Sequence, residues 1–435
     1  MTVLQETSGR QRALLLAIEG AGEDWQASLE ELARLADTAG AEVIGVISQK
    51  RAAADPVHFV GKGKAHEIRQ IAGDAHADVL LVDGDLRPAQ QRNLEEAADI
   101  GVLDRTGLIL DIFARRARSR EGKLQVELAQ LTYLLPRLTG KGTELSRLGG
   151  GIGTRGPGET KLEVDRRHIR HRIGLLRKQV EKIGKRRSVE RRHRQGAGVP
   201  VAGLVGYTNA GKSTLLNALS GSEVFVEDRL FATLDPTIRR VGLPGGREVL
   251  AVDTVGFIRN LPHQLVAAFQ ATLEEAVEAD VLVHVVDASQ PQMEAQIQAA
   301  ERVVAELGCA DKPVVMAYNK CDQIADRAWL RERMERDRYA VAISALTGEG
   351  LEELLRLVGE RLEQSLQQVS VLVPWDAQDL VAEAHARGRV LQEEPGREGL
   401  TLTARVPSDL AGRLLRAAAD KPDPRADLAP PPGSG

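Results

Sequence analysis

Residues 206–214, GYTNAGKST, place two glycines, a lysine and a serine in the spacing G-x-x-x-x-G-K-S. The run follows the strand-like VPVAGLV and precedes the helix-like TLLNALSG, the context in which this motif holds phosphate groups. Gly206 and Gly211 allow backbone N–H groups to wrap around phosphate oxygens, and Lys212 brings a cation to the β and γ oxygens. The Ser213 hydroxyl is a hard oxygen that suits Mg²⁺. The expected nucleotide contacts of this loop also include Tyr207, Thr208, Asn209 and Ala210.

A second apolar strand, EVLAVD, ends in Asp253 and continues as the turn TVG. The Asp253 carboxylate is placed to hold Mg²⁺ through the ligand shell of the ion, and the amide of Gly256 can meet a γ-phosphate. Thr254 and Val255 complete the turn and are also expected at the nucleotide. The two strand ends together predict a site for a nucleoside triphosphate and its magnesium ion.

Two later strands end in residues that can recognise a base. The first, PVVMAYNKCD, ends in Asn319, Lys320, Cys321 and Asp322. The carboxylate of Asp322 can accept both the N1–H and the exocyclic amine of guanine, two donors that adenine lacks at these positions. The second, YAVAISAL, ends in Ser344, Ala345 and Leu346, whose backbone amides can meet the guanine oxygen. The order of these motifs along the chain and their placement at strand ends predict a guanine nucleotide site at the carboxyl edge of an open α/β sheet.

The whole chain is large enough to hold several domains around this site. Its 435 residues exceed the size at which one hydrophobic core usually keeps growing. The net charge of −4 gives no global sign of nucleic acid binding, so any basic surface must be local. Cys309 and Cys321 lack metal-ligand or disulfide spacing, which favours a reducing cytosol. Because neither a leader peptide nor an apolar run of about 18 residues is present, we expect a cytoplasmic protein without membrane association.

The segment 1–115 alternates strand-like and helix-like stretches, which predicts a small α/β domain with a parallel sheet. It contains FVGKGK, in which Gly61 and Gly63 flank Lys62. Two interpretations are open for these residues: a loop that binds an anion, or an ordinary basic turn at the surface.

Residues 116–195 have a different pattern, typical of two helices with apolar seams. The seam of the first helix consists of Leu124, Leu128, Leu131 and Leu135, and that of the second of Ile169, Ile173, Leu176, Val180 and Ile183. Between them lies 139–161, which is too rich in glycine and proline to continue either helix. The pattern predicts an antiparallel coiled-coil hairpin with a glycine-rich tip loop.

The second helix of this hairpin is strongly basic. From 161 to 195 the chain has 14 Lys or Arg residues and four acidic residues, an excess of ten positive charges. Such a helix favours a polyanionic partner through phosphate contacts and counterion release, although charged coiled-coil faces are often only solvated. About two dozen residues of helix would hold the tip roughly 35 Å from the next domain.

The rest of the chain divides into three parts. Strands and helices alternate again over 196–366, which contains all the nucleotide motifs. A small α+β domain is expected over 367–421, and the proline-rich tail 422–435 is expected to be disordered.

The motifs over about 200–366 resemble the five G motifs of a translation-factor-type P-loop GTPase. The resemblance becomes more specific with three further runs, LFATLDPTIRR at 230–240, DTVGFIRNLPHQL at 253–265 and GPGETKLEVDRR at 156–167. Together they resemble the HflX family of ribosome-associated GTPases over nearly the whole chain. The resemblance implies a P-loop GTPase domain between the other domains, and Mg²⁺-dependent hydrolysis of GTP to GDP and phosphate.

The resemblance also implies roles for single residues. Thr233 matches the switch threonine of the family, whose hydroxyl joins Ser213 on Mg²⁺, although spacing alone would also allow Thr237. Lys212, Thr233 and Gly256 are the residues expected to act in catalysis. The nucleotide contacts expected from the switch run are Phe231, Ala232, Thr233, Leu234 and Asp235.

Phe257 stands where a side chain that orients the attacking water would be expected. A phenyl ring can neither hydrogen-bond water nor donate charge, so intrinsic hydrolysis should be slow. Either Phe257 packs under the switch while a backbone group orients the water, or a partner supplies the missing element. The resemblance identifies that partner as the large ribosomal subunit and its RNA.

The resemblance implies a function in which the GTP-bound protein splits stalled ribosomes into subunits and leaves after hydrolysis. Two alternatives remain open: a factor that checks the assembly of large subunits, and a GTP switch that acts on a protein effector through the hairpin. We expect a monomer that binds GTP and GDP and has no DNA partner.

Overall fold

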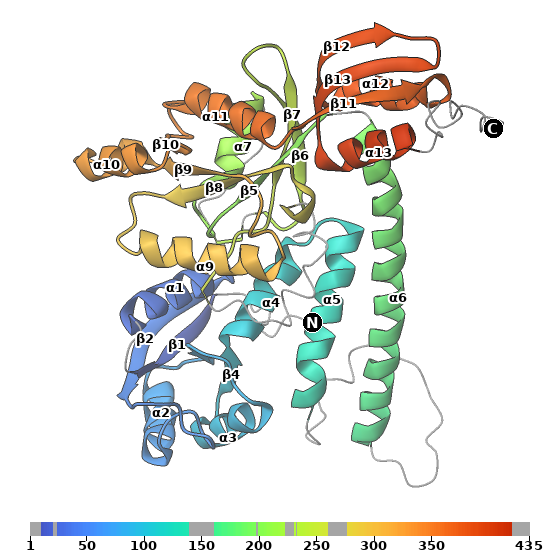
Figure 1. Cartoon of the computed structure of the whole chain (residues 1–435). Coiled ribbons are helices and arrows are strands. Elements are labelled where there is room, and N and C mark those ends of the chain that lie inside the picture. Colours follow the sequence, from blue (N-terminus) through green and yellow to red (C-terminus); the bar gives the residue numbers. More distant parts are fainter. Residues whose placement is uncertain are drawn as a thin grey trace, which may run out of the picture.

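The computed structural model describes residues 10–20, 24–138, 161–196, 199–221, 230–231, 233–259 and 276–419. Within these residues the chain forms three separate sheets, and helix α6 runs alongside the sheet domains (Figure 1). No helix in the described part of the chain is both long and apolar enough to cross a membrane.

The N-terminal domain has a parallel four-stranded sheet in the order β2-β1-β3-β4. Its elements are β1 (Gln11–Glu19), α1 (Trp25–Thr38), β2 (Ala41–Lys50), α2 (Lys62–Asp74), β3 (Val79–Val82), α3 (Pro88–Ala98), β4 (Gly101–Asp104) and α4 (Arg105–Arg116). Alternate strand residues face opposite sides. Leu15 therefore belongs to the core shared with α1 and α4, whereas Leu14 belongs to the core shared with α2 and α3.

The FVGKGK run forms the start of α2. The amide of Gly61 donates to Oε1 of Gln49 at 2.8 Å, and Nζ of Lys64 lies 2.9 Å from Glu67. Because that amide already has a partner within the chain, the contacts favour the ordinary turn over the anion-binding loop.

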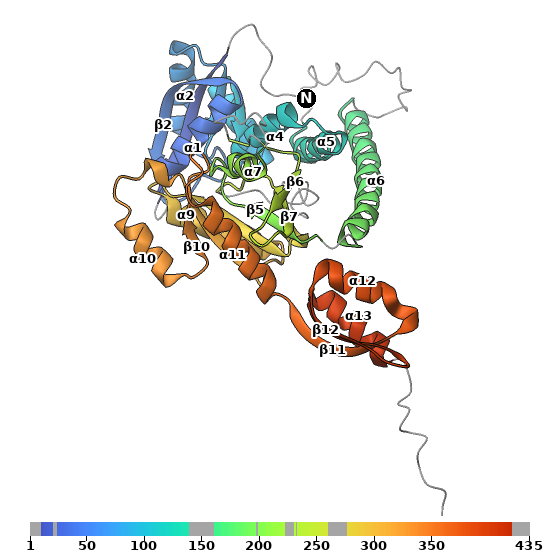
Figure 2. The same ribbon diagram turned by 90° about the horizontal axis from the view of Figure 1, so that it is seen from above.

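Helices α5 (Arg120–Leu134) and α6 (Lys161–Gly196) lie side by side and antiparallel, with the short helix η1 (Leu135–Arg137) after α5 (Figures 1 and 2). Arg166 donates to the carbonyl of Leu138 at 2.9 Å, and Arg172 pairs with Glu127 at 2.7 Å. With 36 residues, α6 is about 54 Å long and exceeds the two dozen residues expected.

The apolar pattern of α5 differs from a simple seam. Its buried apolar residues Val126, Ala129 and Tyr133 belong to the core shared with α4, whereas the seam residues Leu124 and Leu128 are half-buried. On α6, by contrast, the expected seam residues Ile173 and Leu176 are buried. Helix α5 therefore packs on two sides, because it lies between the N-terminal domain and α6.

The central domain has a six-stranded sheet in the order β10-β9-β8-β5-β7-β6, in which only β6 is antiparallel to its neighbour. Its elements are β5 (Val201–Val205), α7 (Lys212–Ser220), β6 (Thr237–Gly242), β7 (Glu248–Asp253), β8 (Val281–Asp287), α9 (Met293–Glu306), β9 (Val314–Asn319), η3 (Cys321–Gln323), α10 (Ala328–Arg336), β10 (Ala340–Ala342) and α11 (Leu351–Gln364). Strand β8 is buried along its whole length, as a central strand covered on both faces should be.

The C-terminal domain is a three-stranded antiparallel sheet in the order β11-β13-β12 with helices on one face. Its elements are β11 (Gln367–Pro374), η4 (Trp375–Ala377), α12 (Gln378–Arg387), β12 (Arg389–Pro395), β13 (Gly399–Val406) and α13 (Ser408–Ala419). Val371, Leu402 and Leu410 form part of its core. The domain projects away from the others in Figure 2. The tail 422–435 and the hairpin tip lie outside the described residues.

Candidate nucleotide site

The loop 206–211 connects β5 to α7 at the carboxyl edge of the central sheet. Gly211 is the N-cap of α7 and has a left-handed backbone with φ of 94°. Free N–H groups at the first turn of a helix and their positive dipole end attract phosphate. The expected phosphate loop therefore has the backbone that anion binding requires.

Lys212 is buried directly above this loop. Its Nζ donates to the carbonyls of Gly206 at 3.1 Å and Tyr207 at 2.9 Å. Burial lowers the pKa of Lys212 to about 8, although the Asp253 carboxylate acts in the opposite direction. Burial also lowers the pKa of the adjacent His284 to about 4, with a further contribution from Lys212, so its imidazole is neutral at pH 7. The Asp253 carboxylate favours the charged form of this buried ammonium, and bound phosphate oxygens would add further negative charge beside it.

Three oxygen side chains converge beside Lys212. Oγ of Ser213 lies 2.6 Å from Oγ1 of Thr233 and 2.6 Å from Oδ2 of Asp253. Asp253 is buried and its Oδ1 has no hydrogen-bond partner among the described residues. Burial raises the pKa of Asp253, whereas Lys212 and the two hydroxyls lower it. Two hydroxyls and a carboxylate with an unused oxygen fit the hard oxygen ligands of Mg²⁺.

Of the two candidate switch threonines, Thr233 is the one whose hydroxyl reaches Ser213. Thr237 instead begins β6, where it pairs in register with Asp253 of β7. The geometry favours Thr233 over Thr237 at the metal corner.

The turn after β7 lies against the phosphate loop. The amide of Phe257 donates to the carbonyl of Gly206 at 3.0 Å, and the amide of Thr208 donates to the carbonyl of Phe257 at 2.7 Å. A Cβ on Gly256 would come within 2.8 Å of the Thr208 backbone and 3.0 Å of Nζ of Lys212, so a side chain would not fit there. Thr254 and Val255 are buried in the same turn.

Phe257 is 1% exposed and belongs to the hydrophobic core that includes Tyr207 and Phe231. Its ring therefore packs beneath the turn and does not point into the phosphate region. Packing of Phe257 under the switch, one of the two interpretations from the sequence, agrees with this position. Its side chain offers the attacking water no hydrogen bond.

On the base side, Asn319 connects two of the predicted loops. Its Nδ2 donates to the carbonyl of Ala210 at 2.8 Å, and its Oδ1 accepts from the amide of Ala345 at 3.0 Å. Asp322 is exposed at the start of η3, next to the buried Cys321, and Leu346 is 79% exposed. Nζ of Lys320 lies 2.7 Å from Asp287, and Ser344 is buried. The Asp322 carboxylate is thus accessible to a base, while Asn319 holds the surrounding loops together.

The sequence predicts nucleotide contacts along the switch run, but apart from Thr233 the described side chains of this run are engaged elsewhere. The ring of Phe231 packs edge-on against Phe113 of α4, with centroids 4.6 Å apart, and Leu234 is buried. The carboxylate of Asp235 accepts hydrogen bonds from the start of α5. The side chains of Phe231 and Asp235 contact the N-terminal half of the chain and that of Leu234 is buried, so only the backbone of these residues is left for a nucleotide. Ala232 lies outside the described residues.

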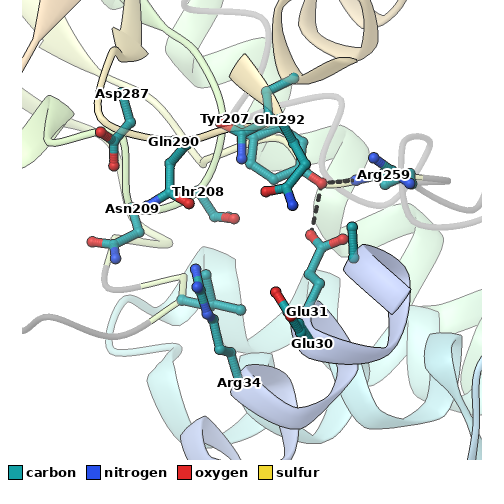
Figure 3. A pocket seen from close by; sticks show the side chains of 13 residues that line it. Glu30, Glu31, Arg34, Tyr207, Thr208, Asn209, Arg259, Asp287, Gln290 and Gln292 are labelled. Atoms are coloured by element: carbon teal, nitrogen blue, oxygen red, sulfur yellow. Dashed lines mark hydrogen bonds between the residues drawn. The ribbon is translucent and has the colours of Figure 1, made fainter. Parts of the chain in front are cut away.

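Sequence reasoning also missed a polar network that joins α1 to the phosphate loop (Figure 3). The Tyr207 hydroxyl donates to Glu31 at 2.7 Å and accepts from the amide of Arg259 at 2.6 Å. Glu31 in turn pairs with the buried Arg105 at 2.5 Å, and Arg105 pairs with Asp83 at 3.0 Å. Burial and then the Glu31 charge raise the pKa of Tyr207, so its phenol remains protonated.

Three features define the P-loop GTPase class. The sheet has six strands with one antiparallel edge strand, a phosphate loop follows β5, and the residues predicted to recognise the base follow β9 and β10. The chain matches four family models in succession along its length. Their descriptions are GTP-binding GTPase N-terminal at 26–114, GTP-binding GTPase Middle Region at 116–194, 50S ribosome-binding GTPase at 201–320 and HflX C-terminal domain at 329–427.

Similar proteins refine this class. The chain is 49% identical over 405 residues to GTPase HflX of Caldanaerobacter subterraneus subsp. tengcongensis, covering 93% of each chain. It is 45% identical over 368 residues to GTPase HflX of Escherichia coli, covering 84% of this chain and 86% of the relative. The chain belongs to the HflX family of GTPases, and it is a GTP hydrolase.

Among solved structures, one match is a GTP-binding protein from the hyperthermophilic archaeon Sulfolobus solfataricus in complex with GDP. Its sequence identity to this chain is 26% and its TM-score is 0.44, over 81% of this chain and 98% of the other.

Proposed function

We propose that this GTPase binds the large ribosomal subunit, splits stalled ribosomes into subunits, and uses GTP hydrolysis stimulated by the ribosome for its release. The observation that carries the proposal is an exposed basic helix, α6, in a hairpin that contacts the switch run of the nucleotide site. The match to a family model described as 50S ribosome-binding GTPase supports the same partner.

The charge of α6 is available to a partner. Among the described side chains of this helix, the exposed basic residues include Arg170, Arg177, Lys178 and Lys182. A row of cations of this kind binds ribosomal RNA through phosphate contacts, with affinity that falls as salt rises. Contacts to base edges and to the shape of the RNA would then supply specificity.

In the proposed site each chain residue has a distinct role. The amides of the loop from Gly206 to Gly211 and the ammonium of Lys212 hold the phosphates, and the amide of Gly256 meets the γ-phosphate. The hydroxyls of Ser213 and Thr233 hold Mg²⁺, with Asp253 behind them. When bound, the ion neutralises charge that develops on the phosphate oxygens. Asp322 selects guanine, and the amides around Ala345 meet its oxygen.

The position of Phe257 bears on the ribosomal stimulation. Its ring is buried in the core, so the side chain at this position cannot orient the attacking water. Hydrolysis should therefore be slow in the free protein and fast once a partner completes the site. Completion of a deficient GTPase site in trans is worth about 10³ to 10⁵ in rate in other GTPases.

The test compares GTP hydrolysis with and without large subunits. Arg166 and Arg172 hold the two helices together, so reversing their charge would damage the hairpin itself. Reversal of Arg170, Arg177 and Lys182 to glutamate should instead lower the ribosomal stimulation, make it more sensitive to salt, and leave the intrinsic rate unchanged. The matched control reverses three exposed arginines on α9 and α10, namely Arg302, Arg331 and Arg336.

Sedimentation of ribosomes with a non-hydrolysable GTP analogue separates the competing functions. Splitting predicts separated subunits, whereas an assembly factor would bind precursor particles and leave intact ribosomes whole. A switch for a protein effector would not sediment with ribosomes. Equal stimulation of the parent, the α6 variant and the control would rule out the hairpin as the ribosome contact.

A further inference from the structure

The switch run is attached to the hairpin through one carboxylate, that of Asp235. It accepts hydrogen bonds from the amide of Arg118 at 3.1 Å, from the amide of Ser119 at 2.8 Å, and from the Ser119 hydroxyl. Ser119 is the N-cap of α5, and its Oγ also accepts from the amide of Gly122 at 2.9 Å. Asp235 therefore acts as a second cap on α5, supplied by a loop 116 residues away.

A glycine in α5 makes this approach possible. A Cβ on Gly122 would lie 2.7 Å from Oδ1 of Asp235, a distance that real Cβ atoms essentially never show. Gly122 is the third residue of α5, and glycine has a lower helix propensity than alanine, so helix formation by itself gives no reason for its presence at this position. The contact with Asp235 does give a reason.

Asp235 lies two residues after Thr233, whose hydroxyl is 2.6 Å from Ser213. Two residues of chain span at most about 7 Å, so fixing Asp235 restricts where Thr233 can lie. Leu234 between them is buried, and Phe231 on the other side packs against Phe113 of α4. The segment that carries Thr233 is therefore held from both sides by helices of the N-terminal half.

We propose that Asp235 is a positioning residue, which holds the Thr233 hydroxyl at Ser213 only while its carboxylate is seated on the start of α5. The hairpin then controls the part of the nucleotide site that distinguishes Mg²⁺-bound GTP from GDP. The inference deepens the proposed function, because it describes how a partner bound to the hairpin would reach the site. It is testable without ribosomes.

The central variant is Gly122→Ala, which keeps every hydrogen-bonding group and favours the helix but blocks the seat of Asp235. Its matched control is Gly73→Ala in α2, where a Cβ would meet nothing within 4 Å. Asp235→Asn tests the same contact with the start of α5 without added bulk, because it removes the charge at nearly constant size. Binding of fluorescent GDP and of a non-hydrolysable GTP analogue is measured with Mg²⁺, together with kcat and KM of the free protein.

We expect Gly122→Ala and Asp235→Asn each to weaken binding of the GTP analogue and to lower kcat by about tenfold, the effect of one charge-assisted hydrogen bond. GDP binding should change less than about twofold, because a displaced Thr233 matters only for the triphosphate state. The double variant should bind the GTP analogue no more weakly than the more affected single variant, since both changes break the same contact between Asp235 and the start of α5.

The proposal is overturned if Gly122→Ala and Asp235→Asn bind both nucleotides as Gly73→Ala does. It is equally overturned if GDP and the GTP analogue weaken to the same extent, or if the two changes are additive. If Gly122→Ala fails to fold, Asp235→Asn alone decides between these outcomes. If large subunits fail to stimulate the parent protein, while Gly122→Ala and Asp235→Asn still weaken binding of the GTP analogue selectively, the result counts against the proposed function and not against the role of Asp235.

Discussion

The hydroxyls of Ser213 and Thr233 lie 2.6 Å apart, although Ser213 is in the first turn of helix α7 and Thr233 belongs to a loop 20 residues later. Both hydroxyls face Asp253, whose carboxylate has an unused oxygen. The pair forms the corner at which the phosphate loop and the switch run meet.

Thr233→Ala should remove one oxygen from this corner. We expect GTP hydrolysis to fall about a hundredfold, because a ligand of the charge-compensating ion is lost, while GDP binding is largely kept. Steady-state hydrolysis and nucleotide titration measure the two effects. Thr237→Ala is the matched control, since this threonine lies in β6. A larger loss in Thr237→Ala than in Thr233→Ala would reverse the choice between them.

Asp322→Asn should change base selectivity. The amide places a donor opposite the guanine N–H groups, so GTP affinity should fall about a hundredfold or more while xanthosine triphosphate binds better than in the parent. Competition between the two nucleotides gives the ratio directly. Asp311→Asn, a change at another exposed aspartate, should leave that ratio unaltered. Unchanged GTP affinity in Asp322→Asn would place the base elsewhere.

Nucleotide affinity should depend on pH through Lys212. Burial lowers the pKa of Lys212 to about 8 in the free protein, and bound phosphate favours the charged ammonium, so its pKa is higher in the complex. Binding then takes up a proton, and affinity falls by up to about tenfold per pH unit as the pH rises above about 8.

Calorimetric titration with GDP in buffers of different ionisation heat measures this proton. Near pH 8 we expect roughly half a proton taken up per nucleotide and about a tenth at pH 7, a range in which the terminal phosphate of GDP is mostly ionised. The range should stay below the pH at which guanine itself loses its N1 proton. A proton release, or no transfer at pH 8, would contradict the assignment of Lys212 to the phosphates.

Tyr133→Phe should weaken the attachment of α5 to the N-terminal domain. The phenol donates to the buried Asp104 at 2.7 Å, and Asp104 also accepts from Arg137 at 3.1 Å and from the amide of Gly107 at 2.8 Å. Loss of one donor to a buried carboxylate should lower the free energy of unfolding by about 1–3 kcal/mol. Denaturant unfolding measures it, and an unchanged midpoint would show that the other donors compensate.

The sequence allowed prediction of those parts of the site that depend on short runs. The phosphate loop, the turn after Asp253 and the residues around Asp322 each occupy consecutive positions, and the topology of a parallel sheet brings strand ends to one edge. The division into strands and helices could likewise be predicted, because the apolar periodicity of each element is contained in a short run of sequence. The division of the chain into domains at 115, 195, 366 and 421 stays a prediction.

The remaining contacts could not be predicted, because they join residues far apart in sequence. Ser119 and Asp235 are separated by 116 residues, and Tyr207 and Glu31 by 176. Nothing in the spacing of either pair identifies the other partner. The leucine repeat of α5 likewise predicts one packed face, whereas Val126 and Tyr133 show that the helix has a second one. A single sequence records which residues are apolar but not how many neighbours surround a helix.

The unbroken length of α6 has a mechanical consequence. A straight rod of 36 helical residues, about 54 Å long, amplifies rotation: a turn of about 10° at the end near the GTPase domain would sweep the opposite end through roughly 9 Å. Conversely, a force applied at the far end of α6 acts on the GTPase domain through a lever arm as long as the helix. A modest push applied far from the nucleotide arrives as a strong torque at the base of the hairpin.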